Sequence, residues 1–155
     1  MQKLRDSSEL QEAAVLLGEI IEATRRMDAA EASKRGERLE RSLADMCARA
    51  GFKSAVVVDS RGLPLADHLS SIPIESVGAL SAVLGDALLR VSSILGQAPL
   101  PLLSIDVDLT DKLVLRRIEA NNDNYFLAVV APQQLDERSD LELSVDQIAT
   151  IINLR

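Results

Sequence analysis

The order of elements from Gly51 to Arg155 is the feature that most restricts the fold of this chain. Apolar runs and turn residues predict a strand, a second strand, a helix, three more strands and a final helix. The first strand contains an Ala-Val-Val-Val run at residues 55–58, which is typical of a strand buried on both faces. Residues 59–62, Asp-Ser-Arg-Gly, predict a hairpin turn in which Gly62 takes a positive φ. Pro64 then places the returning strand at a sheet edge, because proline cannot donate a ladder hydrogen bond.

The later elements follow from periodicity and from helix and turn signals. Pro73 suits the first turn of a helix, and Gly96 marks its end. An Asn-rich stretch at residues 121–124 tolerates left-handed backbone and predicts a second hairpin. These elements are predicted at helix 73–96, strand 104–109, strands 113–119 and 125–130, and a last helix from Ser139 or Ser144 to Leu154. The result is an α+β fold, a five-stranded antiparallel meander with helices on both sides.

The first fifty residues predict a helical segment of separate character. Residues 8–11 fit a capping box, and two apolar stripes follow at helical spacing. Between the stripes, residues 25–38 are almost wholly polar. One long helix and two helices hinged near residues 28–30 both fit, and we favour two because the polar middle offers little to bury. The stripes are Leu10, Ala13, Ala14, Leu17, Ile20, Ile21 and Met27, and then Leu39, Leu43, Met46, Cys47 and Ala50. We therefore expect an N-terminal extension at residues 1–33 and a domain at residues 34–155.

Composition excludes several classes of function. Aromatic residues make up 2% of the 155 residues, so the core is aliphatic and base-stacking surfaces for single-stranded nucleic acid are not expected. A net charge of −7 also argues against nucleic acid and anionic membranes as partners. The single Cys47 excludes an intramolecular disulfide. The start lacks the apolar core of a signal peptide, and no stretch is expected to span a membrane. These features predict a soluble cytoplasmic protein.

No motif for catalysis or for metal binding stands out. His68 and Cys47 lie on different predicted elements, and an Asp106–Asp108 pair is common in any amphipathic strand. Arg116 or Arg117 could serve as an arginine finger, but adjacent arginines in a strand are more often surface charges. We expect no enzyme activity, no cofactor and no metal, so a function must come from surfaces.

The helix at 73–96 has two different faces, and the small one predicts close packing. Two glycines in a helix interior cost about 1 kcal/mol each against alanine, which invites a packing explanation. The large side chains at Val77, Leu80, Leu84, Leu88, Val91 and Leu95 look like an ordinary core stripe. Packing of the small face on the domain's own sheet and packing on a second helix are both possible, and we favour a dimer contact. The residues that we assign to this helical part of a dimer interface are Gly78, Ser81, Ala82, Gly85, Leu89 and Ser92.

The alternating strand and the N-terminal stripe supply the remaining candidate contacts. Ile105, Val107 and Leu109 share one face of the strand at 104–109. If this strand lies at an edge, it can pair with another chain; the alternative is an edge protected by its aspartates. Candidate contacts to a partner are Leu10, Leu17, Ile21 and Arg90.

Several runs together resemble the roadblock domain of the dynein light-chain type. They are Gly-Phe-Lys-Ser-Ala-Val-Val-Val-Asp-Ser-Arg-Gly-Leu-Pro-Leu-Ala at 51–66, Ala-Leu-Ser-Ala-Val-Leu at 79–84, Lys-Leu-Val-Leu-Arg-Arg-Ile at 112–118 and Tyr-Phe-Leu-Ala-Val-Val at 125–130. The resemblance covers residues 34–155 and implies a roadblock/profilin-like sandwich, with one helix on one face of the sheet and two on the other. It also implies homodimers joined through their third strands and middle helices. The extension before residue 34 departs from the minimal domain.

The resemblance implies a function in protein association. Roadblock proteins associate with small Ras-like GTPases as activators or scaffolds, or act as adaptors. We therefore expect a homodimeric regulator of a small Ras-like GTPase. A structural adaptor, with the N-terminal helices as its docking element, is the second hypothesis, and a ligand-sensing domain of related topology is the third.

Overall fold

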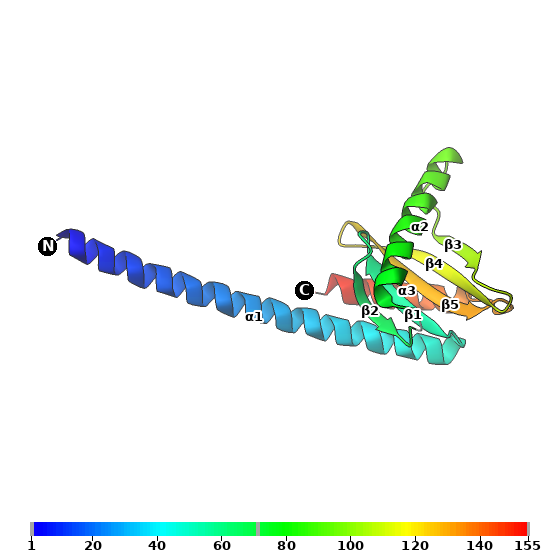
Figure 1. The fold of residues 1–155 in the computed structure, drawn as a ribbon, viewed down its shortest axis with the longest axis horizontal. Coiled ribbons are helices and arrows are strands. Elements are labelled where there is room, and N and C mark those ends of the chain that lie inside the picture. Colours follow the sequence, from blue (N-terminus) through cyan, green and yellow to red (C-terminus); the bar gives the residue numbers. More distant parts are fainter. Residues whose placement is uncertain (1, 71, 155) are drawn as a thin grey trace. The chain divides into compact units, whose positions relative to one another are not determined.

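A computed structural model describes the backbone of residues 2–70 and 72–154, and the side chains of these residues from Asp6 onward. The described chain contains three helices and five strands (Figure 1). It divides into two compact units, Met1–Lys34 and Arg35–Arg155. The boundary predicted from sequence lies one residue earlier, between residues 33 and 34.

The first helix, α1, is assigned from Gln2 to Ala50, so the expected pair of helices is wrong. Residues 28–30, where a hinge was expected, are helical. The polar middle consists mostly of Ala, Glu, Lys and Arg, which have high helix propensity without any burial. Glu22, Glu31 and Glu37 each precede an arginine by four residues, the spacing that stabilises exposed helices.

The domain unit contains an antiparallel sheet in the order β2-β1-β5-β4-β3. The strands are β1 (Ser54–Asp59), β2 (Pro64–His68), β3 (Leu102–Asp106), β4 (Asp111–Ala120) and β5 (Asp123–Pro132). The meander β3-β4-β5 joins the β1–β2 hairpin through pairing of β5 with β1. Because of this junction, β2 and β3 are the two edge strands. The edge position of the strand that contains Pro64 confirms the prediction.

Helices cover both faces of this sheet, which confirms the predicted fold class. Helix α2 (Ile74–Ile94) packs on one face, where Val56 and Val58 contribute to its core. Residues 35–50 of α1 and helix α3 (Arg138–Asn153) share the core of the opposite face with Ala55 and Val57. Strand β1 is therefore buried on both sides, as its apolar run predicted.

Two predicted turns are confirmed. The carboxylate of Asp59 accepts hydrogen bonds from the backbone N–H groups of Arg61 and Leu63, both at 2.9 Å, and Gly62 has a φ of 85°. In the second hairpin, Asn121 and Asn122 take φ values of 52° and 59°. Both turns therefore use Gly or Asn, the residue types for which a positive φ costs the least free energy.

Helix α2 alone has the length and composition of a membrane span among the described helices, contrary to the expectation from sequence. Its inner side, including Val77, Gly85 and Leu88, is buried against the sheet of its own domain. This packing buries 33% of the apolar stretch of the helix.

Candidate interaction surfaces

The small-residue face of α2 lies inside the domain, which corrects the predicted dimer contact. A Cβ atom on Gly78 would collide with the carbonyl oxygen of Gly62 in the β1–β2 turn. A Cβ atom on Gly85 would collide with the ring of Phe126 on β5. The two glycines therefore allow α2 to approach its own hairpin and sheet, which is the alternative to a dimer contact that the sequence also allows.

Two serines on the same face are buried, and one of them has a structural role. Ser92 Oγ donates to the carbonyl oxygen of Leu88 at 2.8 Å and accepts from the N–H of Leu100 at 2.8 Å, so it fixes the chain after the helix. Ser81 is also buried, whereas Ala82 and Leu89 are half-buried. A second helix cannot reach Gly78, Ser81, Gly85 or Ser92 in a folded domain.

The outer face of α2 is instead the apolar one. Val83 is 67% exposed and Ile94 is 83% exposed. Positions 80, 83, 87, 91 and 94 recur at the helical spacing of three and four residues, so their side chains form one stripe. Leu80, Val83, Ala87, Val91 and Ile94 make up this stripe, which we call the α2 surface. Leu80 and Val91 were expected in the core but lie in this exposed stripe. Val77 and Leu88, from the same predicted core stripe, are buried as expected.

Strand β3 lies at an open edge of the sheet. It pairs with β4 from Leu102 to Asp106, and no described strand pairs with its other side. Ile105 belongs to this strand and is partly exposed, in accord with its predicted position. Edge strands present backbone groups that can pair with another chain.

Val107 and Leu109 lie beyond the end of β3, in the turn to β4, which corrects their assignment to the strand. The carboxylate of Asp108 accepts from the N–H and the hydroxyl of Thr110 and from the N–H of Asp111, at 2.7 to 2.9 Å. The hydrogen bonds from the Thr110 and Asp111 backbone lower the pKa of Asp108. The turn held by the Asp108 carboxylate follows the end of β3 at Asp106. Leu109 lies in this turn and is exposed.

The N-terminal unit exposes the apolar stripe predicted for it. Leu10, Leu17 and Ile21 are 71%, 60% and 50% exposed, so these candidate partner contacts lie at the surface of this unit. Contiguous apolar stripes of this length are typical of interaction sites.

The arginines considered from sequence have different surroundings. Arg90 is exposed and pairs with Asp86 at 3.1 Å on the same helix. Arg116 pairs with Glu142 of α3 at 2.9 Å, and Arg117 pairs with Glu119 at 2.6 Å. The side chains of Arg116 and Arg117 are largely buried. Both side chains are therefore held in ion pairs within the domain. An arginine finger instead has to reach the phosphates of a nucleotide bound to the GTPase.

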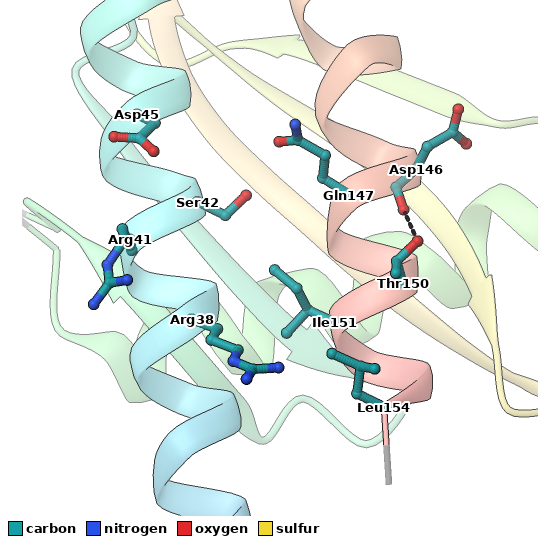
Figure 2. A pocket seen from close by; sticks show the side chains of 9 residues that line it. All are labelled: Arg38, Arg41, Ser42, Asp45, Asp146, Gln147, Thr150, Ile151 and Leu154. Carbon is teal, nitrogen blue, oxygen red and sulfur yellow. Dashed lines mark hydrogen bonds between the residues drawn. The ribbon is translucent and has the colours of Figure 1, made fainter.

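A groove of about 490 Å³ between α1 and α3 was not predicted from sequence. Figure 2 shows Ile151 of α3 and Leu154, which directly follows α3, pointing toward α1, with Arg38 of α1 reaching toward α3. Thr150 and Asp146 also line the groove, and Thr150 Oγ1 donates a hydrogen bond of 2.8 Å to the carbonyl oxygen of Asp146. One feature of the sequence could have indicated this groove. Ile151 is an apolar residue beside the buried stripe of α3, which consists of Leu141, Val145, Ile148 and Ile152.

The described residues contain no group of three or more His, Cys, Asp or Glu that could hold a metal ion. Cys47 is buried in the α1–α3 core, and burial raises the pKa of its thiol to about 11. A protonated, buried thiol is a poor nucleophile. The prominent features of the chain are thus its apolar surfaces.

Taken together, the strand order and the placement of the helices define a roadblock-type fold, as the resemblance in sequence implied. A solved structure of MglB from Myxococcus xanthus matches 76% of this chain and 86% of its own, with a TM-score of 0.61 and 14% identity. A structure described as MglB with a tetrameric arrangement matches 77% of this chain and 88% of its own, with a TM-score of 0.61 and 17% identity.

A roadblock/LC7 domain from Streptomyces avermitilis is also similar in structure. It matches 72% of this chain and 91% of its own, with a TM-score of 0.59 and 18% identity. No protein-family model and no curated protein matches the sequence. The likeness therefore concerns the fold.

Proposed function

We propose that this protein forms a homodimer through the α2 surface and the open edge of β3, and that the dimer binds and regulates a small Ras-like GTPase. It acts as an activator or a scaffold in the cytoplasm and supplies no catalytic residues of its own. The observation that carries the proposal is the exposed apolar stripe of α2 in a domain with the MglB fold.

Physical considerations favour a second copy as the occupant of the α2 surface. Helix α2 contacts β3 within the domain. A twofold contact at this position would bury Val83 and Ile94 against their equivalents and would pair the two β3 edges. The roadblock family, which the sequence resembles, forms dimers from the same two elements. The tetrameric arrangement reported for one MglB structure shows that a protein of this fold can self-associate.

The regulatory part of the proposal rests on the resemblance to proteins that associate with small Ras-like GTPases. With Arg116 and Arg117 held in ion pairs, regulation would proceed by binding and reshaping the switch regions of the GTPase. The test is to add this protein to a small Ras-like GTPase from the same genome and to measure binding and GTP turnover. Faster turnover supports an activator. Absence of binding in both the GTP and GDP states would overturn the proposal.

A structural adaptor is the second candidate, and the exposed stripe of the N-terminal unit favours it. Leu10 and Leu17 offer a docking surface that the fold of the domain does not need. In the same experiment, binding of the GTPase with unchanged turnover would support an adaptor over an activator.

A further inference from the structure

Six residues of the N-terminal unit, five of them from its exposed apolar stripe, have the spacing of a coiled-coil seam. Its members are separated by alternating steps of three and four residues, as the a and d positions of a heptad repeat are. The seam ends at Met27 because the next two positions are Glu31 and Lys34. At 1.5 Å per residue it is about 25 Å long. The seam consists of Leu10, Ala13, Leu17, Ile20, Thr24 and Met27.

We propose that this seam pairs with the same seam of a second copy as an antiparallel coiled coil. In an antiparallel pair, each a position faces a d position. One register brings Leu10 against Met27, Ala13 against Thr24 and Leu17 against Ile20, so that every seam residue has an uncharged partner. A shift by one heptad would place Leu10 against Lys34.

The charges of the helix favour the antiparallel orientation. Residues 6–22 contain five Asp or Glu and no Lys or Arg. A parallel pair would lay two of these acidic segments side by side, within a distance at which salt screens them only in part. The antiparallel register instead lays this segment along residues 15–31 of the second copy, which include Arg25 and Arg26. Glu12 then lies level with Arg25 of the second copy.

This contact is independent of the proposed GTPase and of the α2 surface. It uses residues of the N-terminal unit alone, whereas Val83 and Ile105 belong to the domain. A chain with both contacts has two self-association surfaces, and two domain dimers can be linked through their N-terminal helices.

Cysteine cross-linking of the full chain tests the orientation. Leu10→Cys and Met27→Cys variants are expressed separately, and are also co-expressed with different tags, and each sample is mildly oxidised. We expect a disulfide-linked dimer from the co-expressed pair and none from either variant alone. In the antiparallel register, positions 10 of the two copies are about 25 Å apart along the axis. The unchanged protein is the control, since its only thiol, Cys47, is buried.

Two outcomes overturn the proposal. Cross-linking of each single variant with itself, without the mixed dimer, would show a parallel pair; absence of cross-links in all three samples would show no pair. A matched substitution then tests the seam itself. Leu17 and Val15 are 60% and 61% exposed, but Val15 lies opposite the seam. Adding Leu17→Glu to the cysteine pair should abolish the mixed dimer and adding Val15→Glu should retain it; equal effects would contradict the seam.

Discussion

The backbone of Gly78 in α2 lies against the backbone of Gly62 in the β1–β2 turn, so closely that neither residue has room for a Cβ atom. This contact sets how near α2 comes to the sheet. Because it determines which side of α2 is buried, it also determines which side faces outward. The exposed position of Val83 and Ile94 follows from a contact between two residues without side chains.

The contact predicts that Gly78→Ala destabilises the domain. We expect a loss of about 1–3 kcal/mol from overpacking, although alanine improves helix propensity by about 1 kcal/mol. Chemical denaturation measures the change. Gly36→Ala is the control, because the nearest atom to its Cβ, the carbonyl oxygen of Leu65, would lie 3.9 Å away. It should be stabilising by about 0.5–1 kcal/mol. A neutral Gly78→Ala would refute the tight contact.

The α2 surface predicts that Val83→Asp separates the domain dimer without unfolding the domain. An aspartate at this exposed position is hydrated in the monomer, but in a dimer it would be buried beside its equivalent. Sedimentation measures the mass and circular dichroism checks the fold.

Ser93→Asp adds the same charge on the polar side of the same helix and should leave the mass unchanged. Both variants should also carry Leu17→Glu, so that the N-terminal seam does not hold the two copies together. An unchanged mass for Val83→Asp in that background would remove the α2 surface from the interface.

The sequence predicted those parts of the fold that depend on local chemistry. The turn at Asp59 and the turn at Asn121 were found because a few residue types stabilise them whatever surrounds them. The buried strand β1 was found from its unbroken apolar run, and the edge strand β2 from Pro64. Each of these signals is confined to a few neighbouring residues.

The orientation of α2 could not be read from sequence, because it depends on residues far away along the chain. Both of its faces lack charge, and only the positions of Gly62 and Phe126 decide which one is buried. The end of β3 was missed for a related reason, since its alternation continues to Leu109 while the Asp108 carboxylate bonds into the turn. The prediction of two helices in the first fifty residues failed because the helix propensity of residues 25–38 is high enough to continue α1 without apolar residues to bury.

Burial of Cys47 predicts slow labelling and a component of stability that depends on pH. Desolvation raises its pKa from 9.0 to about 11, so the folded state holds the proton more tightly. This contribution is fully present below pH 9 and is lost as pH rises toward 11. The free energy of unfolding should therefore fall more steeply over this range in the unchanged protein than in Cys47→Ala. Equal slopes, or rapid labelling of the folded chain by a thiol reagent, would contradict the burial.

An ion pair beneath the start of α3 predicts a large effect from a single substitution. Lys112 Nζ lies 2.6 Å from a carboxylate oxygen of Glu137 and donates to the carbonyl oxygen of Leu135 at 2.8 Å. The side chains of the pair are only 13% and 8% exposed. Lys112→Met leaves the carboxylate of Glu137 buried without a partner, which should cost about 3–5 kcal/mol.

The double variant Lys112→Met/Glu137→Met should recover much of that loss, because it removes both charges together. Arg90→Met provides the matched control: it breaks the exposed pair with Asp86 and should change stability by less than about 1 kcal/mol. Denaturant titrations of the unchanged protein and these three variants measure the changes in the free energy of unfolding. If Lys112→Met cost no more than Arg90→Met, the pair would be hydrated, and its role in attaching α3 to β4 would have to be abandoned.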